Sequence, residues 1–145
     1  MIVDRKRIHI SIGIVLELIK NGFDNIFFYI IGPIISKSYF FKLNLLIKKN
    51  NLEANINFIN QLSNKSLIPY YQADDLFLFT LDRQTFGMVI VEAMACRTPI
   101  ASIDSLGGPS EVVIHNVNGI LSILEEYKYD LIKLFGDQMK QKSLS

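Results

Sequence analysis

Short apolar runs alternate with amphipathic segments along most of this chain. Apolar residues recur at helical spacing through 8–19, and Gly22 follows as a helix stop. The continuous apolar run 25–32 has the length of a strand buried on both faces and ends in Gly-Pro. Segment 36–51 has a serine at a helix-cap position and two lysines in its last turn, which suits a helix dipole. These three segments predict a helix, a buried strand and a second helix.

The same alternation continues to the end of the chain. The pattern predicts further strands at 55–59, 76–80, 99–103 and 119–123, and helices at 64–75, from 86–87 onward, at 110–115 and at 125–140. Pro69 disturbs the helix at 64–75. Because buried strands alternate with helices, the sequence predicts an α/β fold, a Rossmann-like doubly wound parallel sheet with helices on both faces. Ligands bind such sheets beyond the carboxyl ends of the strands.

Composition narrows the classes of function. The chain has 145 residues, which suits one domain, and its 15 basic and 14 acidic residues give a formal net charge of +1. This balance argues against nucleic acid as a partner, since dedicated binders show a clear basic excess. Cys96 is the single cysteine and reads as a small apolar residue at a helix end, so no internal disulfide is implied.

The sequence shows neither a secretory signal nor a transmembrane segment. Charged residues stand where the apolar core of a secretory signal should be. The longest apolar stretch is broken at Gly32-Pro33 and falls short of the ~20 residues that span a bilayer. We therefore expect a cytoplasmic protein, soluble or peripheral at a membrane, with no transmembrane segment. A Rossmann dehydrogenase is disfavoured, because no G-x-G-x-x-G follows any predicted strand.

The stretch 83–101 carries the candidate chemistry. Gly87 opens an apolar helix, and helix N-termini carry unpaired N–H groups with partial positive charge, so a diphosphate could bind there. Glu92 lies five residues further, roughly 7–8 Å along the helix axis. A carboxylate at that distance could accept hydrogen bonds from the hydroxyls of a ribose. On spacing alone, an ordinary helix with Glu92 reaching solvent is an equally good interpretation.

Ordered motifs around this stretch resemble a known family. The matching positions are Phe86, Gly87, Glu92, Ala93, Met94, Ala95, Pro99, Ile100, Ala101, Gly107, Gly108, Glu111, Asn118 and Gly119. Upstream, "DRKRIHISI" resembles a basic phosphate-binding segment, and 55–79 resembles the stretch that precedes the hallmark. Together they resemble the C-terminal, donor-binding domain of retaining glycosyltransferases with two Rossmann domains (GT-B), known as group 1 or family 4.

The resemblance implies a role for each matching position. Glu92 would hold the ribose of a nucleoside diphosphate sugar, and Lys6, with Arg7 as a second cation, would neutralise its phosphates. The backbone N–H groups of Gly87 and Met88, next to Phe86, would bind the diphosphate. Leu62 would lie near the nucleobase. Gly107, Gly108 and Glu111 would lie in the loop next to the donor sugar. For Glu111 we favour capping of the following helix. The family needs no metal ion and no cofactor beyond this donor, which it uses for hexosyl transfer with retention.

The departures from the family pattern leave enzymatic activity open. Gln84 stands where the first hallmark acid is expected, so it could bind a donor sugar without the charge that helps transfer. Arg7 replaces an expected glycine. The whole of 1–145 reads as a single GT-B half, truncated at both ends and lacking the N-terminal acceptor domain. The alternatives are a split enzyme whose partner chain supplies that domain, a noncatalytic nucleotide-sugar-binding module, and an inactive gene fragment.

Overall fold

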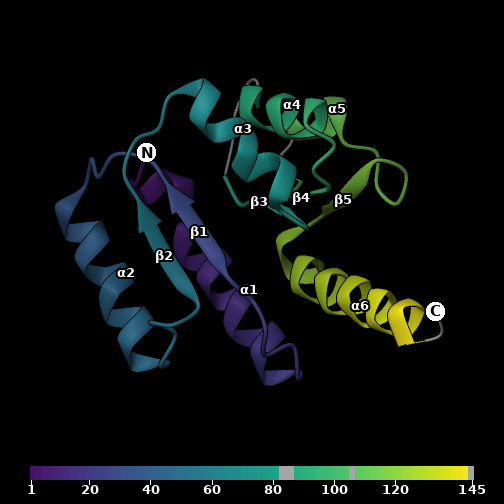
Figure 1. Ribbon diagram of the computed structural model, residues 1–145, viewed down its shortest axis with the longest axis horizontal. Helices are drawn as coiled ribbons and strands as arrows, with labels where there is room; N and C mark the ends of the chain where they lie inside the picture. The colour runs from purple at the N-terminus through teal and green to yellow at the C-terminus, as the bar shows by residue number, and fades with distance from the viewer. Residues whose placement is uncertain (82–86, 105–106, 144–145) are drawn as a thin grey trace.

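The computed structural model describes residues 1–81, 87–104 and 107–143, with side chains described to residue 137. Helices and strands alternate along it (Figure 1). The elements are η1 (Asp4–Lys6), α1 (Ile8–Lys20), β1 (Phe28–Ile31), α2 (Lys37–Lys49), β2 (Ile56–Ile59), α3 (Asn64–Ala73), β3 (Phe77–Phe79), α4 (Met88–Ala95), β4 (Ile100–Ile103), α5 (Pro109–Val112), β5 (Gly119–Ser122) and α6 (Leu124–Ser143). The predicted α/β class and order of elements are confirmed.

The strands are parallel, as predicted, but they form two sheets. One sheet has the order β1-β2, with Phe28 opposite Ile56. The other has the order β3-β4-β5, with Phe77 opposite Ile100. Residues 1–3 extend beside the end of β1 through a single parallel bridge between Ile2 and Ile34. The two sheets are separate because β1 and β3 do not pair with each other. Among the described residues, each of these strands is hydrogen-bonded to a neighbouring strand on one edge only.

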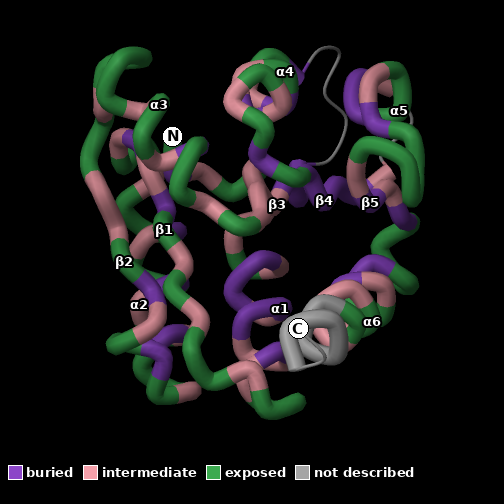
Figure 2. Tube along the Cα trace, turned by 45° about the vertical axis from the view of Figure 1, so that its right-hand side comes forward, coloured by how far each residue is buried: buried purple, intermediate pink, exposed green. Residues whose placement is uncertain are grey.

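Helices cover both faces of the β3-β4-β5 sheet (Figure 2). α4 and α5 lie on one face, where Ile90 and Ala93 pack with Ile100. α1 and α6 lie on the other, where Tyr127 and Leu131 pack with Ala101. Neighbouring residues of β4 thus enter different clusters, as the two-residue period of a strand requires. This arrangement confirms the doubly wound prediction.

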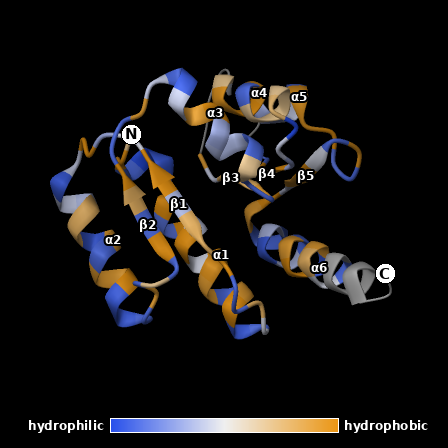
Figure 3. Ribbon diagram, in the orientation of Figure 1, coloured by the Kyte–Doolittle hydropathy of each residue, from blue (hydrophilic) through white to orange (hydrophobic). Residues whose placement is uncertain are grey.

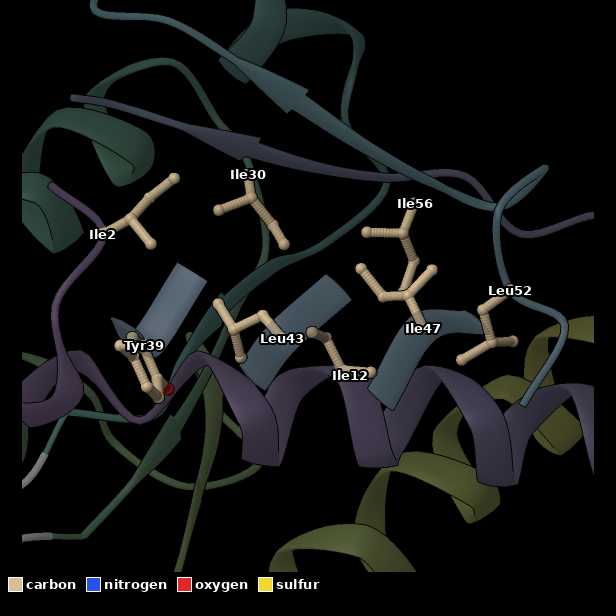
Figure 4. Close-up of a cluster of buried hydrophobic side chains, with 8 residues drawn as sticks. All are labelled: Ile2, Ile12, Ile30, Tyr39, Leu43, Ile47, Leu52 and Ile56. Atoms are coloured by element: carbon tan, nitrogen blue, oxygen red, sulfur yellow. The ribbon is translucent and has the colours of Figure 1, made fainter. Parts of the chain in front are cut away.

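A third cluster joins α1 and α2 to the β1-β2 sheet (Figure 4). Ile12 of α1 packs with Leu43 and Ile47 of α2 beneath Ile30 and Ile56. Burying each such side chain contributes about 1.5–3 kcal/mol relative to leaving it exposed. The cluster holds α2 with one face inward and leaves its opposite face on the surface.

Local signals set the helix ends largely as expected. The hydroxyl of Ser36 accepts a hydrogen bond from the amide of Tyr39 at 3.2 Å, which confirms the predicted cap of α2. Ser63 caps α3 in the same way. The predicted short helix is confirmed as α3, from Asn64 to Ala73, and Pro69 lies inside it and does not end it. Among the described residues, no helix is both long enough and apolar enough to cross a bilayer.

Candidate functional site

Most of the predicted site residues follow the carboxyl ends of strands. Leu62 comes after β2, Gly87 and Met88 come after β3, and Gly107 and Gly108 come after β4. A helix that connects two parallel strands runs back along the sheet, so the N-terminus of α4 lies at the same edge as these loops. The fold therefore places Gly87, Met88, Gly107 and Gly108 at the ligand-binding edge of the β3-β4-β5 sheet, and Leu62 at the corresponding end of the β1-β2 sheet.

Thr80 brings the basic segment to this edge. Its Oγ1 lies 3.2 Å from the carbonyl oxygen of Lys6 and 3.3 Å from that of Arg7, and it is 3.1 Å from Oγ of Ser11. Thr80 and Ser11 are both buried. These contacts hold the end of η1 and the start of α1 against the end of β3. Nothing in the sequence analysis pointed to this role of Thr80.

The basic segment concentrates positive charge in a partly buried position. Burial, and then the charge of Arg5, lowers the pKa of Lys6. An anion beside Lys6 would offset both effects. Arg7 occupies the left-handed region at φ 50° and ψ 35°, a conformation that glycine adopts without strain. The replacement of the expected glycine therefore supplies a cation at some conformational cost.

His9, one turn from Lys6, forms two contacts with the hydroxyl of Tyr39. Its Nδ1 lies 2.9 Å from the hydroxyl of Tyr39, and its backbone N–H donates to the same hydroxyl at 3.1 Å. Burial, and then the charge of Arg7, lowers the pKa of His9. His9 therefore ties the start of α1 to α2.

The N-cap residue of α4 makes no side-chain capping hydrogen bond. Gly87 is the N-cap residue, with φ −92° and ψ 66°, and the side chain of Met88 is 56% exposed. A Cβ on Gly87 would lie 2.9 Å from Cδ1 of Ile90, which is fully buried. The φ of Gly87 is open to any residue, but an added side chain would force Ile90 to shift, so packing favours glycine here. The same lack of a side chain leaves the backbone accessible to an anion.

Glu92 has a hydrogen-bond partner in α3. The hydroxyl of Tyr71 donates to Oε2 of Glu92 at 3.4 Å. Burial, and then the charge of Glu92, raises the pKa of Tyr71 to about 12. Tyr71 is buried, with 9% exposure, and the sequence analysis did not pair it with Glu92. Nothing in the spacing of the two residues signals the contact.

The structure describes some of the remaining predicted site residues and not others. Gly107 and Gly108 have φ of 138° and 29°, so this turn needs glycine. Glu111 lies exposed in the first turn of α5, where a negative charge suits the helix dipole. Leu62 is half-buried just before α3. Gln84 and Phe86 lie outside the described residues. Across the described part of the chain, no three His, Cys, Asp or Glu residues gather in a group that could hold a metal ion.

Comparison with known proteins gives consistent similarities. The sequence profile of the family described as "Glycosyl transferases group 1" matches residues 2–142. The alpha-1,3/1,6-mannosyltransferase ALG2 of Mus musculus is 29% identical over 80 residues, which are 55% of this chain and 19% of that protein. The chain thus spans about a fifth of that relative.

Solved structures share the fold. Anabaena Alr3699/HepE, crystallised in complex with UDP and glucose, is similar with a TM-score of 0.79 and 26% identity, over 95% of this chain and 37% of that one. Sucrose-phosphate synthase of Thermosynechococcus elongatus has a TM-score of 0.79 at 22% identity, over 96% of this chain and 34% of that one, and shows likeness of fold alone.

Proposed function

From the finding that this chain belongs to the glycosyl transferases group 1 family, we propose that it binds a nucleoside diphosphate sugar where α4 begins and serves hexosyl transfer with retention. In this proposal residues 1–145 act as the donor-binding half of a GT-B enzyme. The chain covers only part of the length of its relatives. We therefore propose that polypeptide outside residues 1–145, in the same chain or in a partner chain, supplies the acceptor site.

One observation carries the proposal. Thr80 holds the backbone of Lys6 and Arg7 at the end of β3, and the N-terminus of α4, which begins at the glycine N-cap Gly87, follows the same strand. Two cations and a helix N-terminus at one edge form a setting that favours a diphosphate. The similarity to HepE, which was crystallised with UDP, supports the same ligand class.

Glu92 is proposed to bind the pentose of the donor. It lies in the second turn of α4 and is half-buried, so its carboxylate is available to accept hydrogen bonds. Tyr71 donates to one oxygen of the carboxylate, which limits its rotation. In this proposal the second oxygen of Glu92 accepts from a ribose hydroxyl.

The chemistry follows from the charges. During transfer, the bond between the anomeric carbon and the diphosphate oxygen breaks and negative charge collects on the leaving diphosphate. Lys6, Arg7 and the amides of α4 would stabilise that charge without a metal ion. Gln84 would hydrogen-bond the donor sugar but would lack the charge of the family acid. The noncatalytic module and the inactive fragment are not favoured by the comparisons, and the experiments below separate them.

A thermal-shift series tests donor binding. UDP, GDP and ADP are each added to the folded protein, with the parent nucleosides and inorganic pyrophosphate as reference ligands. We expect at least one diphosphate to raise Tm, since a ligand at 100 times its Kd contributes about 2.7 kcal/mol of stability. The Lys6→Met variant should reduce the shifts by the diphosphate and by pyrophosphate together. Absence of a shift with every diphosphate, from a folded sample, would reject the proposal.

A further inference from the structure

The outward face of α2 combines exposed lysines with exposed apolar side chains, and the proposed function uses none of them. Tyr39, Leu43 and Ile47 turn inward to the core (Figure 4). Helical spacing then places the other side of α2 on the surface. The outward face consists of Lys37, Phe41, Lys42, Leu45, Lys48 and Lys49, all of which are exposed.

Large apolar side chains stand on this face without cover. Phe41 is 63% exposed and Leu45 is 52% exposed. Ile34 and Ile35, which precede α2, are 45% and 60% exposed. A shallow groove of about 550 Å³ runs along Phe41 and Leu45 between Lys37 and Lys48. Hydrophilic and hydrophobic residues alternate along α2 (Figure 3).

The charge around this face is strongly positive. Segment 25–73 contains five lysines and one acidic residue, Glu53, although the whole chain has a net charge of only +1. α2 itself has no acidic residue. In the described part of the chain, the surface ion pairs join Glu17 to Lys20 and Lys128, and the lysines of α2 take part in none. The outward face of α2 therefore carries four lysines and no acidic residue.

We propose that the outward face of α2 binds the surface of an anionic lipid bilayer. The lysines would lie against the lipid phosphates, and Phe41 and Leu45 would enter the boundary between headgroups and acyl chains. A nucleic acid or an acidic protein would match the lysines but would leave these two apolar side chains without an apolar environment. With 13 residues, α2 lies along the interface and does not span it. This inference is independent of the donor site.

Vesicle co-sedimentation tests the electrostatic part. The protein is mixed with vesicles of phosphatidylcholine alone, or with about one third phosphatidylglycerol, and we expect binding to the anionic vesicles only, weakened by salt. The variant Lys42→Gln with Lys49→Gln should bind these vesicles roughly 30-fold more weakly, from about 1 kcal/mol for each lysine. The matched control, Lys128→Gln with Lys133→Gln on α6, removes the same charge elsewhere and should bind like the unaltered protein.

A tryptophan probe tests insertion. The chain contains no tryptophan, so Phe41→Trp introduces a single reporter. Its emission should shift to the blue on addition of anionic vesicles. The control is Phe27→Trp. Phe27 is 60% exposed, and the next residue, Phe28 of β1, packs against the cluster of α1 and α2. Because neighbouring side chains of a strand point to opposite faces, a tryptophan at position 27 would point away from that cluster. Its emission should not change.

The other possible results of these experiments either support the membrane proposal or overturn it. Loss of binding in both the Lys42/Lys49 variant and a Phe41→Ser with Leu45→Ser variant, with circular dichroism unchanged, supports the proposal. Equal binding by the α2 variants and the α6 control would overturn it, as would failure to bind anionic vesicles. Binding that depends on the lysines but gives no blue shift at position 41 would also overturn it, in favour of a soluble polyanion.

Discussion

The hydroxyl of Tyr71 lies 3.4 Å from Oε2 of Glu92, and this contact joins α3 to the helix whose N-terminus forms the candidate donor site. The two residues are 21 positions apart in the sequence. The carbonyl of Tyr71 also accepts a hydrogen bond from Thr98 at 2.5 Å, so the residue is held from both ends. Its ring contacts Phe77 of β3 at a centroid distance of 5.8 Å. A rigid Tyr71 orients the carboxylate of Glu92.

We expect Tyr71→Phe to weaken nucleoside diphosphate sugar binding about three- to tenfold, because the loss of one hydrogen bond corresponds to about 0.5–1.5 kcal/mol. The ring contact with Phe77 remains in this variant. Calorimetric titration with the diphosphate sugar and with pyrophosphate checks it. Pyrophosphate should bind as before, since it does not reach Glu92. Equal weakening of both ligands would show that Tyr71 acts only through the stability of the site.

The pKa of Tyr71 predicts a loss of stability at high pH. Below the ordinary tyrosine pKa of 10.0, both folded and unfolded chains keep the phenol proton. As pH rises from 10.0 toward about 12, the unfolded chain loses the proton first, so the free energy of unfolding falls, by ~2 kcal/mol at most. Burial also raises the pKa of Tyr127, so the difference between the unaltered protein and Tyr71→Phe isolates this effect. Denaturant unfolding across this range should show a shallower decline in the variant.

Glu92→Gln should weaken binding of a ribonucleoside diphosphate about tenfold, because hydrogen bonds to a charged acceptor contribute about 1.5 kcal/mol or more. The same substitution should have little effect on a 2′,3′-dideoxy nucleoside diphosphate, which lacks the two hydroxyls. Titration of both proteins with both ligands completes a double-mutant cycle. An equal loss for the two ligands would place the pentose elsewhere.

Gly87→Ala should destabilise the fold by about 1–2 kcal/mol, because the new Cβ would meet Cδ1 of Ile90 at 2.9 Å. Ile90→Val removes that methyl group and by itself should cost about 1 kcal/mol. In the double variant, we expect a smaller loss than the sum of the two single losses. Urea unfolding of the four proteins measures this coupling. Strict additivity would mean that Ile90 does not restrict position 87.

Gln84→Glu restores the charge that the family pattern expects, and we predict a gain in sugar transfer, or in hydrolysis of the donor when no acceptor is present. The physical reason is the stabilisation of positive charge near the reacting carbon in the transition state. Turnover of radiolabelled donor measures it, with Gln84→Ala as the matched control. If Gln84→Glu and Gln84→Ala turn over no more donor than the unaltered protein, the glutamine is not what limits transfer.

Local patterns in the sequence were sufficient to predict much of the fold. The strand within 25–32 is recognisable from its apolar run, but the predicted burial of both faces is wrong, because Tyr29 of β1 (Phe28–Ile31) is 43% exposed. The cap at Ser36 follows from side-chain chemistry within one turn. The Gly107-Gly108 turn follows likewise from positive φ. The position of Glu92 in α4 follows from helix spacing. Each of these features depends on residues that are neighbours in the chain.

Only the tertiary structure decided how these pieces meet. The contact of Thr80 with Lys6 joins residues 74 positions apart, and that of Tyr71 with Glu92 joins two helices separated by a strand. The division into two sheets also depends on which strand edges find a partner. Such contacts follow from the way that whole elements pack, and packing depends on the shapes and apolar surfaces of all the elements together. The sequence pattern therefore located the candidate residues, and packing determined which of them lie within reach of one another.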